Sequence, residues 1–305
     1  MHGTIYVGVD GGGTKTALGA YDARGRLISE CTVGPLNYNF IGMEAALRHL
    51  CEGIEALGVD RAQIRAVGIG DPSIDDVAET DASIRFLRAA EQMLGVPVFI
   101  RSDAYVTLYG LTGGKEAGVL VISGTGAMGI AEDAEGKISL AGGWGRLTGD
   151  EGSGYDIGLR GISAALRAAD GIGTETALLP AALGYFGVSQ PRALIDCFYG
   201  EEEPDVAGFA RCVAECADDG DACAEEILLS AARYLAECAS VLIRKSRASL
   251  VGVYGSVLLK NRTVRAEFER CVRERCPDVR IKEPAVSAVQ SAALYAAMKE
   301  KENTV

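Results

Sequence analysis

Val7-Gly8-Val9-Asp10-Gly11-Gly12-Gly13-Thr14-Lys15-Thr16, residues 7–16, is the stretch that decides the fold. Its apolar start predicts a buried strand over residues 4–9, and its three glycines predict a loop whose backbone N–H groups can approach an anion closely. Thr14 adds a hydroxyl donor and Lys15 a cation, so the loop suits a phosphate group. Asp10, at the end of the strand, suits a magnesium ion held directly or through water.

This loop differs from the phosphate-binding loop that leads into a helix. Thr14 separates Gly13 from Lys15, and the chain returns as a strand, because residues 17–22 and 26–33 have the pattern of a hairpin. An ordinary tight hairpin without a ligand is the alternative interpretation.

The first loop has a second copy further along the chain. Gly13-Thr14-Lys15-Thr16-Ala17 leads into Asp22-Ala23-Arg24-Gly25-Arg26-Leu27, and Gly124-Thr125-Gly126-Ala127-Met128 leads into Asp133-Ala134-Glu135-Gly136-Lys137-Ile138. Gly124 follows Gly13 by 111 positions, and Asp133 follows Asp22 by the same 111 positions. We therefore predict two homologous halves, each of which begins with a glycine hairpin.

Residues 124–129 also match the dinucleotide fingerprint Gly-x-Gly-x-x-Gly letter by letter. That fingerprint has to lead into a helix, whereas Ile130-Ala131-Glu132 continues as a strand toward the next turn. We therefore favour a second phosphate hairpin, formed by Gly124, Thr125 and Gly126, over a nicotinamide site.

Asp103 follows a strand that the pattern predicts over residues 96–100. The active sites of α/β folds lie at the carboxyl ends of their strands, so Asp103 is a candidate catalytic carboxylate. It could instead cap the short helix predicted over residues 104–110, and the two roles are compatible.

The densest glycine stretch of the chain contains its only tryptophan, Trp144, and two adjacent acids, Asp150 and Glu151. The indole offers a flat face to a sugar ring, and the carboxylates can accept hydrogen bonds from its hydroxyls. The alternative is a buried tryptophan and an acidic helix start. Asn37 and Asn39, in the loop after the first hairpin, are either turn formers or polar recognition groups.

The composition of the 305-residue chain limits the classes of function. Lys and Arg total 30 against 42 Asp and Glu, and the net charge of −12 argues against binding to nucleic acid or to an anionic membrane. Nine cysteines without a Cys-x-x-Cys pair predict reduced thiols, and two histidines make a Cys/His zinc site poorly supplied. The sequence has neither a signal-peptide pattern nor a long apolar run, so we expect a cytoplasmic protein.

A chain of this length fits two domains, and no Pro- or Ser-rich linker separates them. We expect a tight hinge within residues 113–118, and helices that dominate from Ser153 onward. Helical spacing predicts helices over residues 42–57, 81–94, 153–169, 174–186, 190–198, 204–217, 221–247, 262–275 and 285–300, with further strands over 66–69, 119–122 and 250–254.

Together these motifs resemble the superfamily of acetate and sugar kinases, heat-shock chaperones and actin. Within it the sequence is most similar to the N-acetylglucosamine kinase group and the related BadF/BadG/BcrA/BcrD-type ATPases. Residues 7–16 look like the family's first phosphate motif and Ile122-Ser123-Gly124-Thr125-Gly126 like its second. Gly142-Gly143-Trp144-Gly145 with Gly149-Asp150-Glu151-Gly152-Ser153 resembles its sugar signature, and Val253-Tyr254-Gly255-Ser256-Val257 through Asn261 resembles its adenosine motif.

The resemblance covers nearly the whole chain and implies an α/β fold. The fold would consist of two duplicated ribonuclease H-like domains of the actin/hexokinase type, with a nucleotide and sugar cleft between them. Residues 1–115 would form a small N-terminal domain, against which the final helix, residues 286–305, packs. Residues 116–285 would form a larger C-terminal domain. A homodimer is also expected.

The resemblance further implies roles for individual residues. Asp103 would be the general base for the sugar hydroxyl. The Mg²⁺ role of Asp10 is expected from its position at the end of the strand. The sugar would lie at or near Asn37, Asp103, Thr125, Trp144 and Asp150, to which we add the neighbouring candidates Asn39 and Glu151. ATP would be bound by Gly11, Gly12, Gly13, Thr14, Lys15, Gly124, Thr125 and Gly126 at its phosphates and by Gly255 and Ser256 at its adenosine.

The chain departs from the family pattern in four places. Ala127 stands where serine is usual after Gly-Thr-Gly, and this change is expected to weaken a phosphate or sugar contact. The other three bear on the identity of the substrate more than on nucleotide binding. Ile69-Gly70-Asp71-Pro72 replaces Gly-Leu-Ala-Gly, Ser256 replaces a glycine of the adenosine motif, and Ser287-Ala288-Val289-Gln290 replaces a glycine near the final helix.

We therefore expect a kinase that uses ATP and Mg²⁺ to phosphorylate the primary hydroxyl of a hexose, such as the amino sugar N-acetylglucosamine, to the 6-phosphate. Glucosamine, N-acetylmuramate and other hexoses are alternative substrates. An ATPase that activates a radical enzyme is a second alternative, but no cysteine flanks either phosphate loop to hold a cluster. A nucleotide-dependent sugar sensor without turnover is the non-enzyme alternative.

Overall fold

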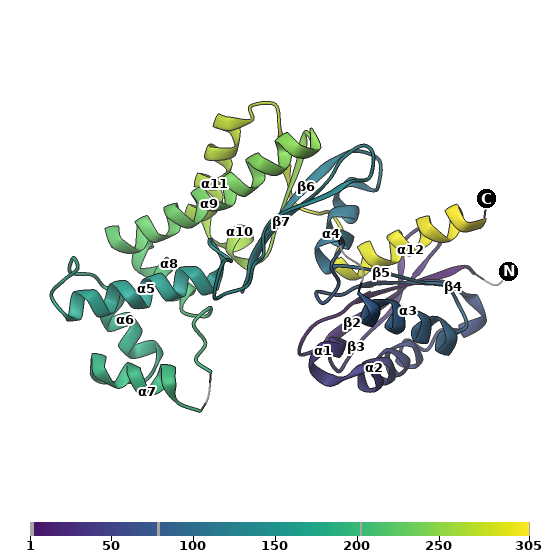
Figure 1. Ribbon diagram of the computed structural model, residues 1–305, viewed down its shortest axis with the longest axis horizontal. Helices are drawn as coiled ribbons and strands as arrows, with labels where there is room; N and C mark the ends of the chain where they lie inside the picture. The colour runs from purple at the N-terminus through teal and green to yellow at the C-terminus, as the bar shows by residue number, and fades with distance from the viewer. Residues whose placement is uncertain (1–2, 78–79, 202, 305) are drawn as a thin grey trace. The chain divides into compact units, whose positions relative to one another are not determined.

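The computed structural model describes residues 3–77, 80–201 and 203–304 (Figure 1). The chain divides into two compact units. The first unit is Met1–Ala117 together with Glu283–Val305, and the second is Gly118–Lys282. Each unit contains one five-stranded sheet.

The sheet of the first unit has the strand order β3-β2-β1-β4-β5. Strands β1, β2 and β3 are antiparallel neighbours, while β4 and β5 join β1 in parallel. The strands are β1 (Ile5–Asp10), β2 (Thr16–Asp22), β3 (Leu27–Val33), β4 (Ile64–Gly70) and β5 (Val98–Arg101). The helices are α1 (Tyr38–Ile41), α2 (Met43–Ala56), α3 (Asp81–Leu94), α4 (Asp103–Thr112) and α12 (Ala288–Thr304), with a 3₁₀ turn at Arg61–Gln63.

The sheet of the second unit has the order β10-β9-β6-β7-β8. Its strands are β6 (Gly118–Ser123), β7 (Ala127–Glu132), β8 (Ile138–Gly142), β9 (Leu250–Tyr254) and β10 (Arg280–Lys282). Its helices are α5 (Gly154–Ala169), α6 (Leu178–Tyr185), α7 (Leu194–Tyr199), α8 (Ala210–Asp218), α9 (Ala222–Ser246), α10 (Ser256–Lys260) and α11 (Arg262–Arg275), with a 3₁₀ turn at Pro191–Ala193.

The two sheets have the same topology. In each, three antiparallel strands follow one another along the chain, and two later strands extend the sheet in parallel on the other side of the first strand. Strand β8 begins at Ile138, 111 positions after Leu27 begins β3. The predicted duplicated α/β fold is therefore confirmed. The sequence patterns did not predict β8, β10, α1 or α10, which are all short.

The core of the first unit requires two glycines in adjacent strands. Helix α12 packs against β1 and β4, and in Figure 1 its yellow ribbon lies beside the purple strands. A Cβ atom on Gly8 would lie 1.8 Å from the carbonyl oxygen of Val289, and one on Gly68 would lie 2.0 Å from that of Ala292. Glycine at both positions therefore allows the backbone of α12 to approach the sheet closely.

The helices of the two units differ in length, from the four residues of α1 to the 25 of α9. Among the residues that the structure describes, none of these helices combines the length and the apolar character needed to cross a bilayer.

Candidate active site

The first glycine loop, residues 11–15, is fixed at its base and open at its tip. The backbone N–H of Gly11 donates to the carbonyl oxygen of Gly70 over 2.7 Å, and that of Leu36 donates to the carbonyl oxygen of Gly12 over 3.2 Å. Gly13 and the two residues after it are exposed. The loop thus follows β1, is anchored to the end of β4 and exposes its tip to solvent.

The predicted phosphate loops require glycine for steric reasons at one position and have open space at two others. A Cβ on Gly12 would lie 2.5 Å from the carbonyl oxygen of Lys15, so the turn itself requires glycine there. A Cβ on Gly13 or on Gly124 would meet no atom within 4 Å. Bare backbone at these two positions is what a loop that binds a phosphate through its N–H groups needs.

Asp103 is the first residue of α4, beyond the carboxyl end of β5. Ser102 is the N-cap, because its hydroxyl accepts from the backbone N–H of Tyr105 over 2.9 Å. The interpretation of Asp103 as the cap is therefore wrong. Among the described residues, its carboxylate accepts only from the N–H of Ala104, through Oδ1 over 2.8 Å, which leaves the other oxygen available to a ligand.

The surroundings of Asp103 favour its protonated form. Burial is the main cause, and the carboxylates of Asp10, Asp71 and Asp76 add to it, while the N–H of Ala104 opposes it. Together they raise the pKa of Asp103 to about 6. A carboxylate with this pKa is ionised at neutral pH and is a stronger base than an ordinary aspartate, which suits general-base catalysis.

Asp10 has the properties of a ligand for a hard cation. It is the last residue of β1, its side chain makes no hydrogen bond or ion pair with the described residues, and burial raises its pKa. One carboxylate beside a phosphate loop fits Mg²⁺, which is usually held by one or two carboxylates together with substrate phosphates.

The second glycine loop, residues 124–126, is shorter than the first and is held by the start of α5. The N–H of Gly154 donates to the carbonyl oxygen of Gly124 over 2.7 Å, and the N–H of Tyr155 donates to that of Thr125 over 3.2 Å. A Cβ on Gly126 would lie 2.9 Å from Oδ2 of Asp150. The loop, the helix terminus and Asp150 therefore form one cluster within the second unit.

The predicted adenosine motif adjoins the same loop. A Cβ on Gly255 would lie 2.3 Å from the carbonyl oxygen of Ser123 and 2.9 Å from the nitrogen of Gly124. Gly255 has a φ of 89°, which favours glycine, and exposed Ser256 begins α10 directly after it. The structure thus brings both predicted nucleotide motifs of this unit together.

Trp144 lies on the surface of the second unit. It is 78% exposed, so the interpretation of a buried tryptophan is wrong. Asp150 accepts from the N–H of Gly145 over 3.1 Å, which links the acid to the tryptophan loop. Burial, and to a smaller extent Glu151, raise the pKa of Asp150, whereas the N–H of Gly145 lowers it.

Glu151 has a different environment from Asp150. Its Oε2 is buried and has no hydrogen-bond partner among the described residues. The pKa of the Tyr234 hydroxyl on α9 is raised, mainly by burial and to a smaller extent by Cys238 and Glu151. Because Glu151 affects this hydroxyl, it lies beside α9. Ser153 is the N-cap of α5, so the acid in the first helical turn is Asp156 and neither predicted acid belongs to it.

The two asparagines are also placed differently from each other. Asn37 is 8% exposed and is the N-cap of α1, where its Oδ1 accepts from the N–H of Asn39 over 3.1 Å. This bond confirms the turn-forming interpretation of Asn37. Asn39 is exposed.

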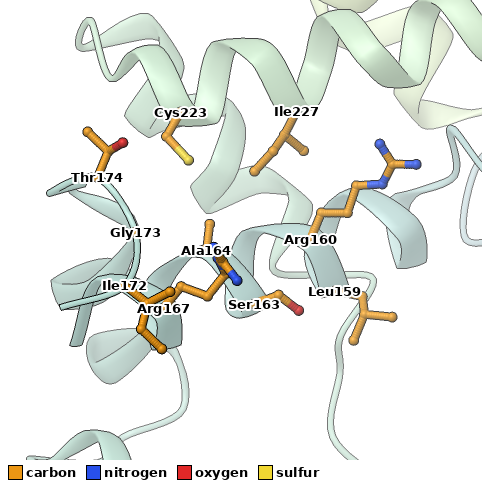
Figure 2. Close-up of a pocket in the computed structure, with 10 residues that line it drawn as sticks. All are labelled: Leu159, Arg160, Ser163, Ala164, Arg167, Ile172, Gly173, Thr174, Cys223 and Ile227. Atoms are coloured by element: carbon orange, nitrogen blue, oxygen red, sulfur yellow. The ribbon is translucent and has the colours of Figure 1, made fainter. Parts of the chain in front are cut away.

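A separate pocket of about 720 Å³ lies within the second unit, where α5, the start of α9 and the loop after α5 surround it (Figure 2). In Figure 2, Cys223 and Ile227 project from one helix toward Ala164 on the other. None of the residues that sequence reasoning assigned to the site lines this pocket.

Sequence reasoning missed the charged neighbours of Asp103. Asp76 pairs with Arg101 over 2.8 Å and accepts from the N–H of Ser102 over 3.1 Å, so it holds the chain just before Asp103. Asp71 was noted only as a departure from the family pattern. The signal that could have found it is its position directly after a strand that neighbours β1, because acids at adjacent strand ends lie close together.

The comparisons with known proteins agree with this fold. The BadF/BadG/BcrA/BcrD ATPase family matches residues 7–296. An N-acetylmuramic acid/N-acetylglucosamine kinase of Clostridium acetobutylicum is 30% identical over 285 residues, which cover 90% of this chain and 92% of that protein. An N-acetyl-D-glucosamine kinase of Dictyostelium discoideum is 31% identical over 258 residues, 80% of this chain and 81% of that protein.

A solved structure from Chromobacterium violaceum, provisionally named an N-acetylglucosamine kinase, superposes with a TM-score of 0.75 at 24% identity. The superposition covers 96% of this chain and 99% of that one. At this identity the likeness establishes the shared fold.

Proposed function

The chain belongs to the BadF/BadG/BcrA/BcrD ATPase family, and from this premise we propose that it is an amino-sugar kinase. It transfers the γ-phosphoryl group of ATP to the primary hydroxyl of a sugar such as N-acetylglucosamine. The two curated relatives, which are named as kinases of N-acetylglucosamine or N-acetylmuramic acid, support this substrate class.

The observation that carries the proposal is the position and the raised pKa of Asp103. Its carboxylate lies at the carboxyl end of the first sheet, has one free oxygen, and has a pKa raised to about 6. As general base it accepts the proton of the sugar hydroxyl while the hydroxyl oxygen bonds to the γ-phosphorus and the bond between that phosphorus and ADP breaks. Such a transfer depends on positioning and on stabilisation of charge, both of which the protein supplies.

The remaining predicted residues position the two substrates. The backbone N–H groups of residues 11–13 and 124–126 would bind the phosphates, with Thr14 and Lys15 as additional donors. Gly255 and Ser256 would adjoin the adenosine. Trp144 offers its exposed face to the sugar. Oδ1 of Asn37 and Oδ1 of Asp150 accept from Asn39 and Gly145, and the other polar atom of each side chain would bind a sugar hydroxyl or amide.

Asp10 would hold the magnesium ion that accompanies ATP in such reactions. When bound, Mg²⁺ neutralises phosphate charge. The net charge of −12 repels ATP, so its capture depends on these local groups.

A substrate panel tests the proposal. The purified protein is mixed with ATP, Mg²⁺ and one sugar at a time (N-acetylglucosamine, glucosamine, N-acetylmuramate or glucose), and release of ADP is measured. We expect release of ADP that depends on an amino sugar, and NMR of the product should show the phosphate on carbon 6 of that sugar. Release of ADP at the same rate without any sugar would favour the ATPase alternative, and sugar binding without ADP release would favour the sensor.

A matched pair of variants identifies the base. Asp103→Asn should lower kcat by about 10²- to 10⁴-fold, the scale of general-base catalysis, while ATP affinity is retained. Glu44→Gln removes one carboxylate from an exposed site in the same unit and should leave turnover unchanged.

A further inference from the structure

The carboxylate of Asp71 has an oxygen atom without a partner. Asp71 is 1% exposed, and its Oδ1 accepts from the backbone N–H of Ser73 over 2.8 Å and from its hydroxyl over 2.6 Å. Oδ2 is buried and receives no hydrogen bond from any described residue. A buried carboxylate oxygen without a donor is destabilising, so its presence calls for an explanation, and a ligand that supplies the donor is one.

Asp71 lies at the edge of the sheet that carries the candidate base. Its backbone N–H donates to the carbonyl oxygen of Arg101 over 3.0 Å, so it extends the pairing of β4 with β5. The preceding residue, Gly70, is so close to α4 that a Cβ on it would lie 3.3 Å from the Cα of Asp103. The charge of Asp71 also adds to the negative potential at Asp103, so a substrate whose hydroxyl reaches Asp103 lies within the range of that charge.

The alternation of side chains along β4 also places Asp71 on the same side of the sheet as Asn37. Val67 and Ile69 belong to the core that includes Leu36, whereas Gly68 and Gly70 face α12 and α4. Because Asp71 continues the strand pairing, it follows Val67 and Ile69 on their side of the sheet. Leu36 and Tyr38 belong to this core, so Asn37 between them, the N-cap of α1, lies on that side too.

Three carboxylates at this edge have no cationic partner. Arg101 is paired with Asp76, but Asp10, Asp71 and Asp103 form no ion pair with any described residue. Both Asp10 and Asp71 add to the negative potential at Asp103. Because these charges are partly or wholly shielded from water, they act strongly on a charged group that binds beside them. The edge therefore favours a ligand with a positive charge.

The charge of that ligand is better supplied by an ammonium group than by a metal ion bound to Asp71. Gly8 faces α12, so Asp10, two residues later, lies on the opposite side of the sheet from Asp71. In addition, no group of three His, Cys, Asp or Glu side chains in the described part of the chain is placed to hold a metal. An ammonium group needs only acceptors, which Oδ2 of Asp71 provides.

We propose that Asp71 is a specificity-determining residue that stabilises the ammonium group of an amino sugar, and so favours a free amine over an acetamide. The proposal rests on the amino-sugar kinase function and names the feature of the substrate that this edge selects. The family pattern quoted above has alanine where this chain has Asp71, so the preference would distinguish this chain from kinases with that pattern.

The test compares three sugars in the wild type and in Asp71→Asn. This variant keeps the shape and the Ser73 contacts of the side chain but removes its charge. We expect kcat/KM for glucosamine to fall by about 10- to 100-fold, the scale of a hydrogen bond to a charged group, mainly through KM. The values for N-acetylglucosamine and glucose should change little, because neither sugar carries a positive charge. Glu44→Gln should change none of the three.

Two outcomes would overturn the proposal. An equal loss for all three sugars would assign Asp71 a structural role, and an unchanged value for glucosamine would leave it no role in selectivity. Asp71→Ala, the residue of the family pattern, is the second variant if Asp71→Asn does not fold, and it must shift the glucosamine to N-acetylglucosamine ratio in the same direction.

Failure of the proposed kinase function can be distinguished from failure of the proposed role of Asp71. If the wild type phosphorylates none of the sugars, the kinase proposal fails. Calorimetric titration of glucosamine and glucose into the wild type and Asp71→Asn then decides the role of Asp71 without turnover, since only glucosamine binding should weaken in the variant. Equal binding of glucosamine by both proteins would contradict it.

Discussion

The backbone N–H of Gly11 donates to the carbonyl oxygen of Gly70 across 2.7 Å, so the first glycine loop is anchored to the end of the neighbouring strand β4. On its other side Gly70 lies against α4, whose first residue is Asp103. One residue without a side chain therefore separates the predicted phosphate loop from the predicted base, and the distance between these two groups depends on it.

Gly70→Ala should disturb both neighbours. The new Cβ would lie 2.6 Å from Cγ2 of Val106 and 3.3 Å from the Cα of Asp103, which forces α4 to shift. We expect a loss of about 1–3 kcal/mol in the free energy of unfolding, as in other overpacked sites, together with a lower kcat. Urea denaturation and ADP release measure the two effects.

Gly184→Ala is the matched control for this change. Gly184 lies in α6 of the second unit, and a Cβ on it would meet no atom within 4 Å. Alanine there should leave stability equal or slightly higher, because glycine is a poor helix former. If Gly70→Ala is as stable and active as this control, the close approach of Gly70 to α4 has no functional consequence.

Gly13→Ala should separate ligand binding from folding. A Cβ on Gly13 has open space around it, so the melting temperature should not change. If the loop binds phosphate through its backbone, the added methyl group obstructs the ligand, and the Kd for ATP should rise by about tenfold or more, equivalent to about 1.4 kcal/mol. Calorimetry with ATP measures this, and an unchanged Kd would remove Gly13 from the phosphate site.

The sequence predicted the sheets better than the site, for a physical reason. The strand that ends at Asp10, the hairpin after it and the copy of both 111 residues later are local patterns of apolar residues and glycine, and the structure confirms them. Strands β8 and β10 contain no fully buried residue, whereas the equally short β9 has the run of buried residues that predicts a strand. The positions of β8 and β10 are set by pairing with β7 and β9.

The environment of the predicted base could not be derived from local sequence. Burial at Asp103 and its closeness to Asp10 and Asp71 depend on which strands are neighbours, and this information is spread over the whole first unit. Capping by Asp103 was one of two compatible interpretations of the sequence, and the neighbouring Ser102 is an equally good N-cap. The side-chain geometry, in which Ser102 accepts from Tyr105, decides between them.

The raised pKa of Asp103 predicts a pH dependence of turnover. A general base acts in its ionised form, so kcat/KM should fall about tenfold per pH unit as the pH decreases below about 6. An ordinary aspartate would give this acidic limb, the part of the pH profile in which kcat/KM falls, near pH 4. A pH–rate profile measured with saturating ATP tests this, and the limb should be absent from the residual activity of Asp103→Asn. A limb that persists in the variant belongs to another group.

The same pKa predicts a gain in stability for Asp103→Asn. Because the folded pKa of about 6 lies above the ordinary aspartate value of 3.8, the folded protein binds this proton more tightly than the unfolded chain does. The stability that Asp103 contributes is therefore fully present below pH 4 and is lost as the pH rises through 6. The variant should melt at a higher temperature than the wild type at pH 7, and the difference should shrink toward pH 4.

Trp144→Ala should affect the sugar and leave the fold and ATP unchanged. The indole is 78% exposed in the second unit, so its removal should cost little in the free energy of unfolding. If the ring stacks on the sugar, KM for N-acetylglucosamine should rise by about tenfold while KM for ATP stays constant. Leu147→Ala is the control, because Leu147 is 86% exposed three residues away and has no predicted role. A change in KM for ATP alone, or equal effects in both variants, would exclude Trp144 from the sugar site.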